Sequence, residues 1–177
     1  MVKKVIKFLS YCLFFALALI AFSPKSSFYF LFEKELKKFD VVISKESLHE
    51  TFLSLEVEHL DISAKKIESA TVGSAEITLL LLYNSITLQD ISLSSLVESY
   101  LPSKIEHFTV GYSLLNPLNI TAEAEGDFGE ASVVFEIDSR VLRVSLKPSK
   151  TMQKKYYKSM KLFTKDKNGE YSYAKNF

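Results

Sequence analysis

The sequence predicts an α+β protein, mainly β, in which an N-terminal transmembrane helix precedes a curved antiparallel meander with amphipathic helices at both ends. Three observations predict this fold class. An almost unbroken apolar run covers residues 5–22. Apolar and polar residues then alternate over most of residues 40–147, as in strands that bury one face. Apolar residues at helical spacing flank this region, at residues 27–39 and 149–163.

The apolar run is just long enough to cross a membrane, because a spanning helix needs roughly 17–25 residues. Lys3, Lys4 and Lys7 lie at its start, and the first acidic residue is Glu33. Positive residues stay in the cytoplasm, so we expect the N-terminus inside and the chain after Pro24 outside. We interpret residues 1–24 as an anchor whose lipid-facing side chains are Phe8, Leu9, Leu13, Phe14, Phe15, Leu17, Leu19, Ile20 and Phe22.

A cleaved signal sequence has the same plan and is the alternative interpretation. Its small-residue cleavage pattern occurs at Ala16-Leu17-Ala18, but inside the apolar run; cleavage after Ala21-Phe22-Ser23 would place Pro24 directly at the cut. We favour an uncleaved anchor, because the run reaches spanning length only when it is kept whole. The single cysteine, Cys12, lies inside the run, so we expect neither a disulfide nor a cysteine metal site in the remaining domain.

Residues 25–177 are predicted to form one domain that begins with an amphipathic helix. In residues 27–39, Phe28, Leu31 and Phe32 lie at helical spacing, and these side chains are expected either to rest in the membrane interface or to pack on the sheet. A polar helical turn is expected at Lys45–Thr51. The following strand slips by one residue at His59, which predicts a bulge.

Residues 40–147 are predicted to form the antiparallel sheet. Leu79–Leu82 is apolar on both faces, which predicts a strand covered on both sides, followed by a turn at Asn84-Ser85. Residues 93–101 break the alternation and end at a proline, as a short helix does. Four further alternating segments between residues 105 and 147 are separated by tight turns and complete the meander.

The last part of the chain is basic. Met152, Tyr156, Met160 and Phe163 predict the apolar stripe of a helix over residues 149–163, and the tail 164–177 alternates as a final short strand does. Residues 25–146 carry 10 basic and 19 acidic side chains, whereas residues 147–177 carry nine lysines and two acidic residues. We favour a helix that packs on the acidic body; the alternative is contact with an anionic surface through Lys150, Lys154, Lys155, Lys158 and Lys161.

We find no pattern that predicts catalysis. His49, His59 and His107 form no ligand-spaced pair, so no metal is expected. Paired carboxylates such as Glu123 and Glu125 are neighbours on one solvated strand face. No nucleophile motif, phosphate-cradling glycine loop or RNA-binding signature is present. We therefore expect neither an enzyme, a cofactor nor nucleic-acid binding.

The order of these elements resembles the type II secretion protein N (GspN) family and, more broadly, the AsmA-like proteins of the bacterial envelope. The resemblance spans most of the chain and is carried by residues 55–62, 75–83, 114–126, 131–137 and 162–173. It implies a single-pass inner-membrane protein with a periplasmic sheet, whose partners are subunits of an envelope-spanning secretion or DNA-uptake machine. This chain is shorter than typical members of the family.

Two functions are compatible with these features. The first, which we favour from the sequence, is a non-enzymatic assembly subunit that binds other envelope proteins through exposed edge strands. The second is a lipid-binding or lipid-transfer module, in which an apolar face including Leu79, Leu81, Ile120 and Val133 holds phospholipid. An apolar face fully covered by helices favours the first function, and an open trough without charged lining favours the second.

Overall fold

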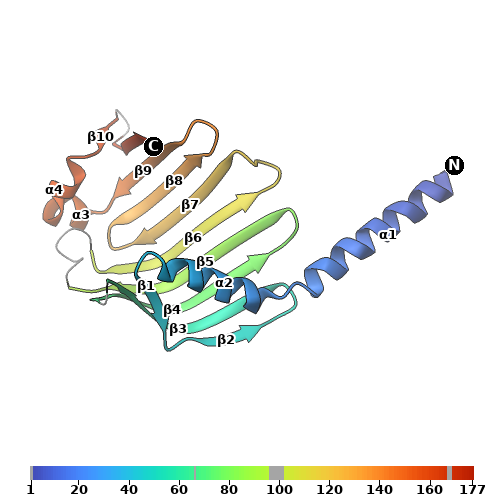
Figure 1. Ribbon diagram of the computed structural model, residues 1–177. Coiled ribbons are helices and arrows are strands. Elements are labelled where there is room, and N and C mark those ends of the chain that lie inside the picture. Colours follow the sequence, from blue (N-terminus) through green and yellow to red (C-terminus); the bar gives the residue numbers. More distant parts are fainter. Residues whose placement is uncertain (1, 66, 96–101, 167–168) are drawn as a thin grey trace.

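The computed structural model describes residues 2–65, 67–95, 102–166 and 169–177. It consists of a long N-terminal helix that leaves one end of a large curved sheet (Figure 1). The helices are α1 (Val2–Ala21), α2 (Lys25–Lys37), α3 (Lys150–Lys155) and α4 (Tyr157–Met160). The strands are β1 (Val41–Ser44), β2 (Ser47–Glu50), β3 (Ser54–Ala64), β4 (Ile67–Leu79), β5 (Tyr83–Leu93), β6 (Lys104–Ser113), β7 (Asn119–Gly126), β8 (Gly129–Glu136), β9 (Val141–Pro148), β10 (Thr164–Lys165) and β11 (Tyr171–Asn176).

All eleven strands belong to one antiparallel sheet. Their order is β1-β3-β4-β5-β6-β7-β8-β9-β11-β10, with β2 also paired to β3. Strands β3 to β9 therefore follow one another in space as they do along the chain, which confirms the predicted meander. The α+β class, mainly β, with a long apolar helix at the N-terminus, is also confirmed.

A line of irregular residues bends the first part of this sheet. Lys45, His59 and Asp90 have positive φ angles of 67°, 57° and 52°. The register places His59 opposite Gly73, and Gly73 opposite Asp90, at the same level of three adjacent strands. Side-chain alternation shifts there in each strand, as predicted at His59. The predicted bulge is not at His59, because the register of β3 with β4 is unbroken there; the register shift lies between Ile62 and Ser63. A Cβ on Gly73 would lie 3.0 Å from Asp90 Cβ, and this close approach explains the glycine.

Two clusters of buried side chains lie on the same face of the sheet. Under α2, Leu55 and Val57 are fully buried and pack with Tyr29. At the other end, Met152, Tyr156 and Met160 pack with Leu146 and Phe128. Of the four residues predicted for the apolar stripe of the C-terminal helix, three are thus buried, and Phe163 is half-buried. The Ser149 hydroxyl accepts a hydrogen bond from the Met152 amide and caps α3.

The structure corrects several expectations for the helices. Residues 149–163 form two short helices, because Tyr156 leaves the helical region at φ −113° and ψ 26°. Helix α2 starts two residues earlier than predicted, and it buries Lys25 and Tyr29, whereas Phe28, Leu31 and Phe32 are exposed. The predicted stripe therefore faces away from the core.

Two expectations for the strands are also wrong. The stretch predicted as a polar turn contains β2, which continues the register of β1 along β3 beyond the break at Lys45. Leu80–Leu82 forms a hairpin tip instead of a covered strand, and Asn84 and Ser85 belong to β5. The predicted final strand is present as β11. The short helix expected at residues 93–101 falls largely outside the described residues.

Candidate functional site

The candidate site is the apolar face of the sheet, which continues across nine strands. Residues that are partners across neighbouring strands point to the same face. One such row consists of Leu48, Val57, Ala75, Leu88, Phe108, Ala124, Ala131, Leu146 and Tyr171. The next row consists of Glu50 on β2, then Leu55, Ile77, Ile86, Val110, Ala122, Val133, Val144 and Tyr173. Apart from Glu50 at the β2 edge, neither row contains a charged residue.

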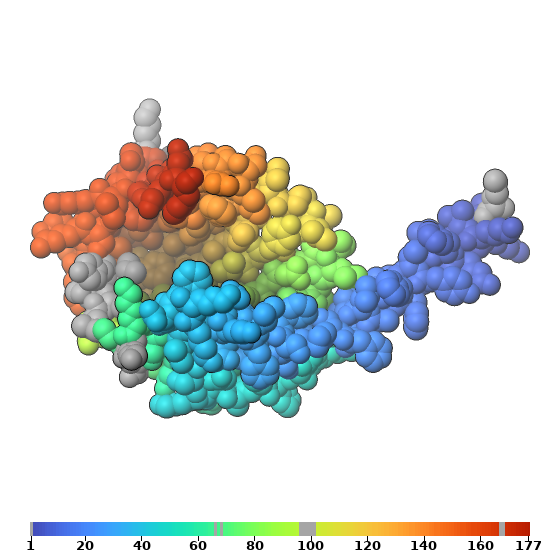
Figure 2. Space-filling model, in the orientation of Figure 1, coloured from blue at the N-terminus to red at the C-terminus, as the bar shows by residue number. Residues whose placement is uncertain are grey.

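Within the described parts of the chain, helices cover this face only near its two edges. Helix α2 packs against β1, β2 and β3, and α3 packs against β9. Between them, Val110, Ala122 and Val133 on β6–β8 are only half-buried. Figure 2 shows the resulting hollow, in which the yellow and orange strands lie deep between α2 and the red C-terminal segment.

A cavity of about 720 Å³ lies where this hollow meets α3 and α4. Its floor includes the small side chains of Ala124 and Ala131, and its walls include Phe108, Met152 and Phe163. The volume falls within the range of about 300–1,000 Å³ that is typical of small-molecule sites. Among the described lining residues, Lys158 is the only charged one, and its side chain is exposed. This arrangement suits a ligand with a long apolar part and an anionic end.

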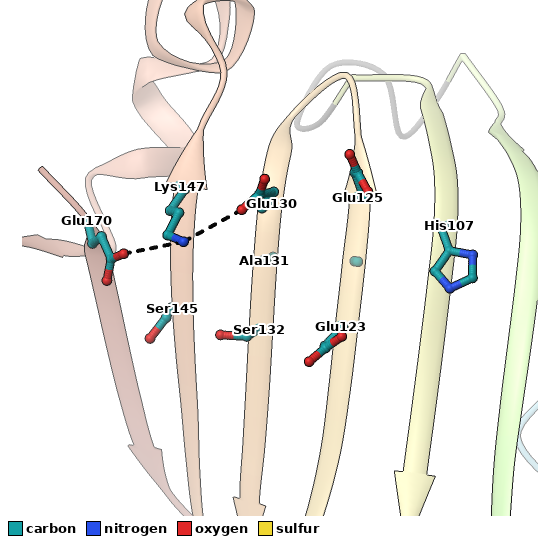
Figure 3. Close-up of a pocket in the computed structure, with 10 residues that line it drawn as sticks. His107, Glu123, Glu125, Glu130, Ala131, Ser132, Ser145, Lys147 and Glu170 are labelled. Carbon is teal, nitrogen blue, oxygen red and sulfur yellow. Dashed lines mark ion pairs between the residues drawn. The ribbon is translucent and has the colours of Figure 1, made fainter.

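The opposite face of the sheet is polar (Figure 3). A shallower hollow of about 460 Å³ is lined there by His107, Glu123, Glu125, Ser132 and Ser145, among others. Lys147 Nζ lies 3.7 Å from carboxylate oxygens of both Glu130 and Glu170. Glu123 and Glu125 lie on this exposed face of β7, as expected from their spacing.

On this polar face, His107 lies beside a threonine and apart from Ser132. His107 Nε2 lies 2.9 Å from Thr109 Oγ1, so its ring is engaged within its own strand. Ser132 lies on β8, two strands away from His107, or roughly 10 Å at the usual strand spacing. Within the described ranges, no group of three or more His, Cys, Asp or Glu side chains is placed to hold a metal ion.

Three of the four residues predicted for the apolar face lie on that face, but none of the four lines the cavity of about 720 Å³. Leu79 and Ile120 lie in a third row with Asn84 and Tyr112, next to the row that contains Val133. Leu81 instead lies in the β4–β5 hairpin tip, where it is exposed. The alanines that form the cavity floor were not predicted as site residues. The sequence shows them as small residues on the apolar face of alternating strands. It does not show how far the helices extend over that face, and therefore does not show that these alanines line a cavity.

The lysines predicted to contact an anionic surface are all exposed: Lys150, Lys154, Lys155, Lys158 and Lys161. Two of them lie over aromatic rings, with Lys155 Nζ 5.2 Å from the ring centre of Tyr156 and Lys161 Nζ 5.8 Å from that of Tyr157. Helices α3 and α4 pack on the apolar face and not on the acidic one. Of the five lysines, only Lys158 lines the cavity.

All nine predicted anchor residues lie on or beside α1. Eight of them are large exposed apolar side chains, and the ninth, Ile20, is half-buried. Helix α1 is the one described helix that is long and apolar enough to span a membrane, and a signal sequence near the N-terminus has the same properties.

The junction between α1 and α2 is fixed to the sheet edge by Lys25 and Glu50. The buried Lys25 ammonium lies 3.4 Å from the carbonyl oxygens of Ile20 and Ser23, at the C-terminal end of α1. The Glu50 carboxylate accepts hydrogen bonds from the amides of Lys25 and Ser26 and from the Ser26 hydroxyl. The Ser26 hydroxyl bond is the main reason that the pKa of Glu50 lies below its usual value. Glu50 thereby caps α2, whose own N-cap residue is Pro24.

Comparisons of the chain with protein-family models, with curated proteins and with solved structures find no match.

Proposed function

We propose that this protein is a non-enzymatic, membrane-anchored module that binds a lipid on the apolar face of its sheet. The observation that carries the proposal is the cavity of about 720 Å³ at the junction of the sheet with α3 and α4, whose lining is apolar except at Lys158 and Ser159. The acyl chain lies over Ala124 and Ala131, and the headgroup phosphate lies near the exposed ammonium of Lys158.

The proposal places α1 across the bacterial inner membrane, with the N-terminus in the cytoplasm and the sheet in the periplasm. The lysines before the apolar run support this orientation. The contact of the buried Lys25 ammonium with the Ile20 and Ser23 carbonyl groups supports an uncleaved helix, because cleavage between these residues would remove it. The proposal includes the resemblance of this chain to GspN-like and AsmA-like envelope proteins.

A second candidate function is that of an assembly subunit in an envelope-spanning secretion or DNA-uptake machine. The outer edge of β11 favours this second function. Strand β10 covers only the start of that edge, where it pairs with Tyr171 and Ser172. Among the described residues, the edge over residues 173–176 has no neighbouring strand, and an extended segment of a partner protein can add to such an edge.

Binding of a fluorescent fatty acid to the purified full-length chain in mild detergent tests the first proposal. Ala131→Phe places a ring in the cavity, and a ring that excludes about three methylene groups of the ligand costs about 2.4 kcal/mol. We therefore expect roughly 50-fold weaker binding. Ser132→Phe is the matched control, because its side chain lies on the polar face of the same strand and should leave binding unchanged.

A second pair of variants tests the role of charge. Lys158→Glu should weaken binding of an anionic lipid, and Lys154→Glu, another exposed lysine of the same segment, should not. Equal binding by the wild type, Ala131→Phe and Lys158→Glu would show that the cavity is not the lipid site.

A further inference from the structure

Four successive loops open at the end of the sheet from which α1 departs. The Glu50 carboxylate, which holds the start of α2, directly precedes the β2–β3 loop. The Leu114 amide donates a hydrogen bond to the Leu82 carbonyl, which joins the β6–β7 loop to the β4–β5 loop. The Ile137 amide donates in the same way to the Leu118 carbonyl, which adds the β8–β9 loop. These loops therefore form one continuous rim.

Exposed apolar side chains crowd the first three loops of this rim. Six of them define what we call the apolar rim: Phe52, Leu53, Leu81, Leu82, Leu114 and Leu115. They are 42–83% exposed, and the loop residues 51–53, 80–82 and 114–118 include no charged residue. A large apolar patch of this kind on a folded domain marks an interaction surface. The fourth loop, residues 137–140, carries Asp138 and Arg140, and the turns at the other end of the same strands include Lys65 and Asp127.

The apolar rim also meets the C-terminal end of α1. Leu19 and Ile20 of α1 line a hollow of about 380 Å³ together with Leu79, Leu80 and Leu81. The apolar run of α1 ends at Phe22, so the boundary of the hydrocarbon layer falls at this level. Figure 1 shows α1 pointing away from the sheet on the side of the β4–β5 and β6–β7 loops. A bilayer that contains α1 therefore reaches these loops.

We propose that the apolar rim inserts into the outer leaflet around α1, so that the open end of the apolar face stands directly on the lipid surface. This inference rests on the anchoring part of the proposed function. Exposed leucine and phenylalanine side chains in contact with acyl chains no longer face water, which is the same burial that holds an interfacial helix at a membrane. The half-exposed Tyr83 beside the rim has the amphipathic ring that is favoured at the membrane interface.

Site-specific labelling of the full chain in phosphatidylethanolamine/phosphatidylglycerol vesicles tests the inference. A thiol-reactive fluorophore is attached at Leu115→Cys or at Asp127→Cys, each in a Cys12→Ser background, and at the native Cys12. Asp127 lies at the far end of β7, and a strand of this length places it about 25 Å from the rim. Quenching is then measured with spin-labelled lipid and with aqueous iodide.

We expect the Leu115 probe to be quenched by the lipid spin label and protected from iodide, and the Asp127 probe to show the reverse. A Leu115 probe that iodide quenches as strongly as the Asp127 probe overturns the inference. A Leu115 probe protected from iodide but not quenched by lipid also overturns it, since a protein surface then covers the rim. The Cys12 probe separates the two proposals, because iodide quenching at Cys12 overturns the anchor itself.

Discussion

Tyr29 offers a direct test of how α2 is held on the sheet. Its side chain is 3% exposed and packs edge-on against Phe30, with the ring centres 5.7 Å apart. Its hydroxyl oxygen is buried and has no hydrogen-bond partner among the described residues. A buried polar atom without a partner costs about 1–3 kcal/mol. Tyr29→Phe removes that atom and keeps the ring, so we expect the free energy of unfolding to rise by up to this amount.

Thermal unfolding of the full chain in detergent measures this effect. A gain of 1 kcal/mol raises the Tm of a domain of this size by about 2–4 °C. Tyr83→Phe is the control, because Tyr83 is 44% exposed. A lower Tm for Tyr29→Phe would contradict the reasoning, since it would mean that the hydroxyl has a stabilising partner.

The pH dependence of the same two proteins gives a second signature. Burial, followed by the charges of Glu46 and Glu33, raises the pKa of Tyr29 from 10.0 to about 12. Between these values the unfolded chain loses a proton that the folded chain keeps, so wild-type stability falls as pH rises. Tyr29→Phe has no ionisable group at this position, so its stability does not fall for this reason. The difference in Tm between the two proteins should therefore widen from pH 10 to pH 12.

Two further predictions concern the α1–α2 junction and the β7–β8 turn. Glu50→Gln should weaken protection of the Lys25 and Ser26 amides from hydrogen exchange at neutral pH. This difference should vanish as pH falls below 4.5 through the lowered pKa of Glu50, and Glu56→Gln on the polar face should show no such effect. Gly129→Ala should lower Tm strongly, because φ is 110° and the new Cβ would lie 2.1 Å from the Lys147 carbonyl oxygen. Gly169→Ala, at φ 88° with no atom within 4 Å, should cost only the backbone strain of about 1–2 kcal/mol, and equal losses would contradict the contact argument.

The sheet was predictable because each of its strands from β6 to β9 alternates apolar and polar residues. Such alternation follows directly from burial of one face. Alternation does not reveal what covers that face. Whether Val110 and Val133 are covered depends on how far α2, α3 and α4 extend over the sheet. The sequence favoured a face covered by helices, whereas the structure has a hollow there.

The Leu79–Leu82 run shows a different limit. A run that is apolar on both faces is typical of a covered strand, but the same run suits a hairpin tip that meets an apolar environment. The pairing of Leu79 with Asn84 distinguishes the two alternatives, because it places the following leucines in the tip of the hairpin. The shift in alternation was visible at His59, but its continuation through Gly73 and Asp90 depends on the strand register, which the sequence does not specify.

The most direct test of lipid binding is photo-crosslinking in cells from the apolar face. A benzophenone amino acid replaces Phe108, which lines the cavity, or its neighbour Thr109, which lies on the polar face. Mass spectrometry then identifies what each position captures. We predict a lipid adduct at position 108 and none at position 109. Crosslinks from position 108 only to protein would contradict lipid binding and favour the assembly subunit.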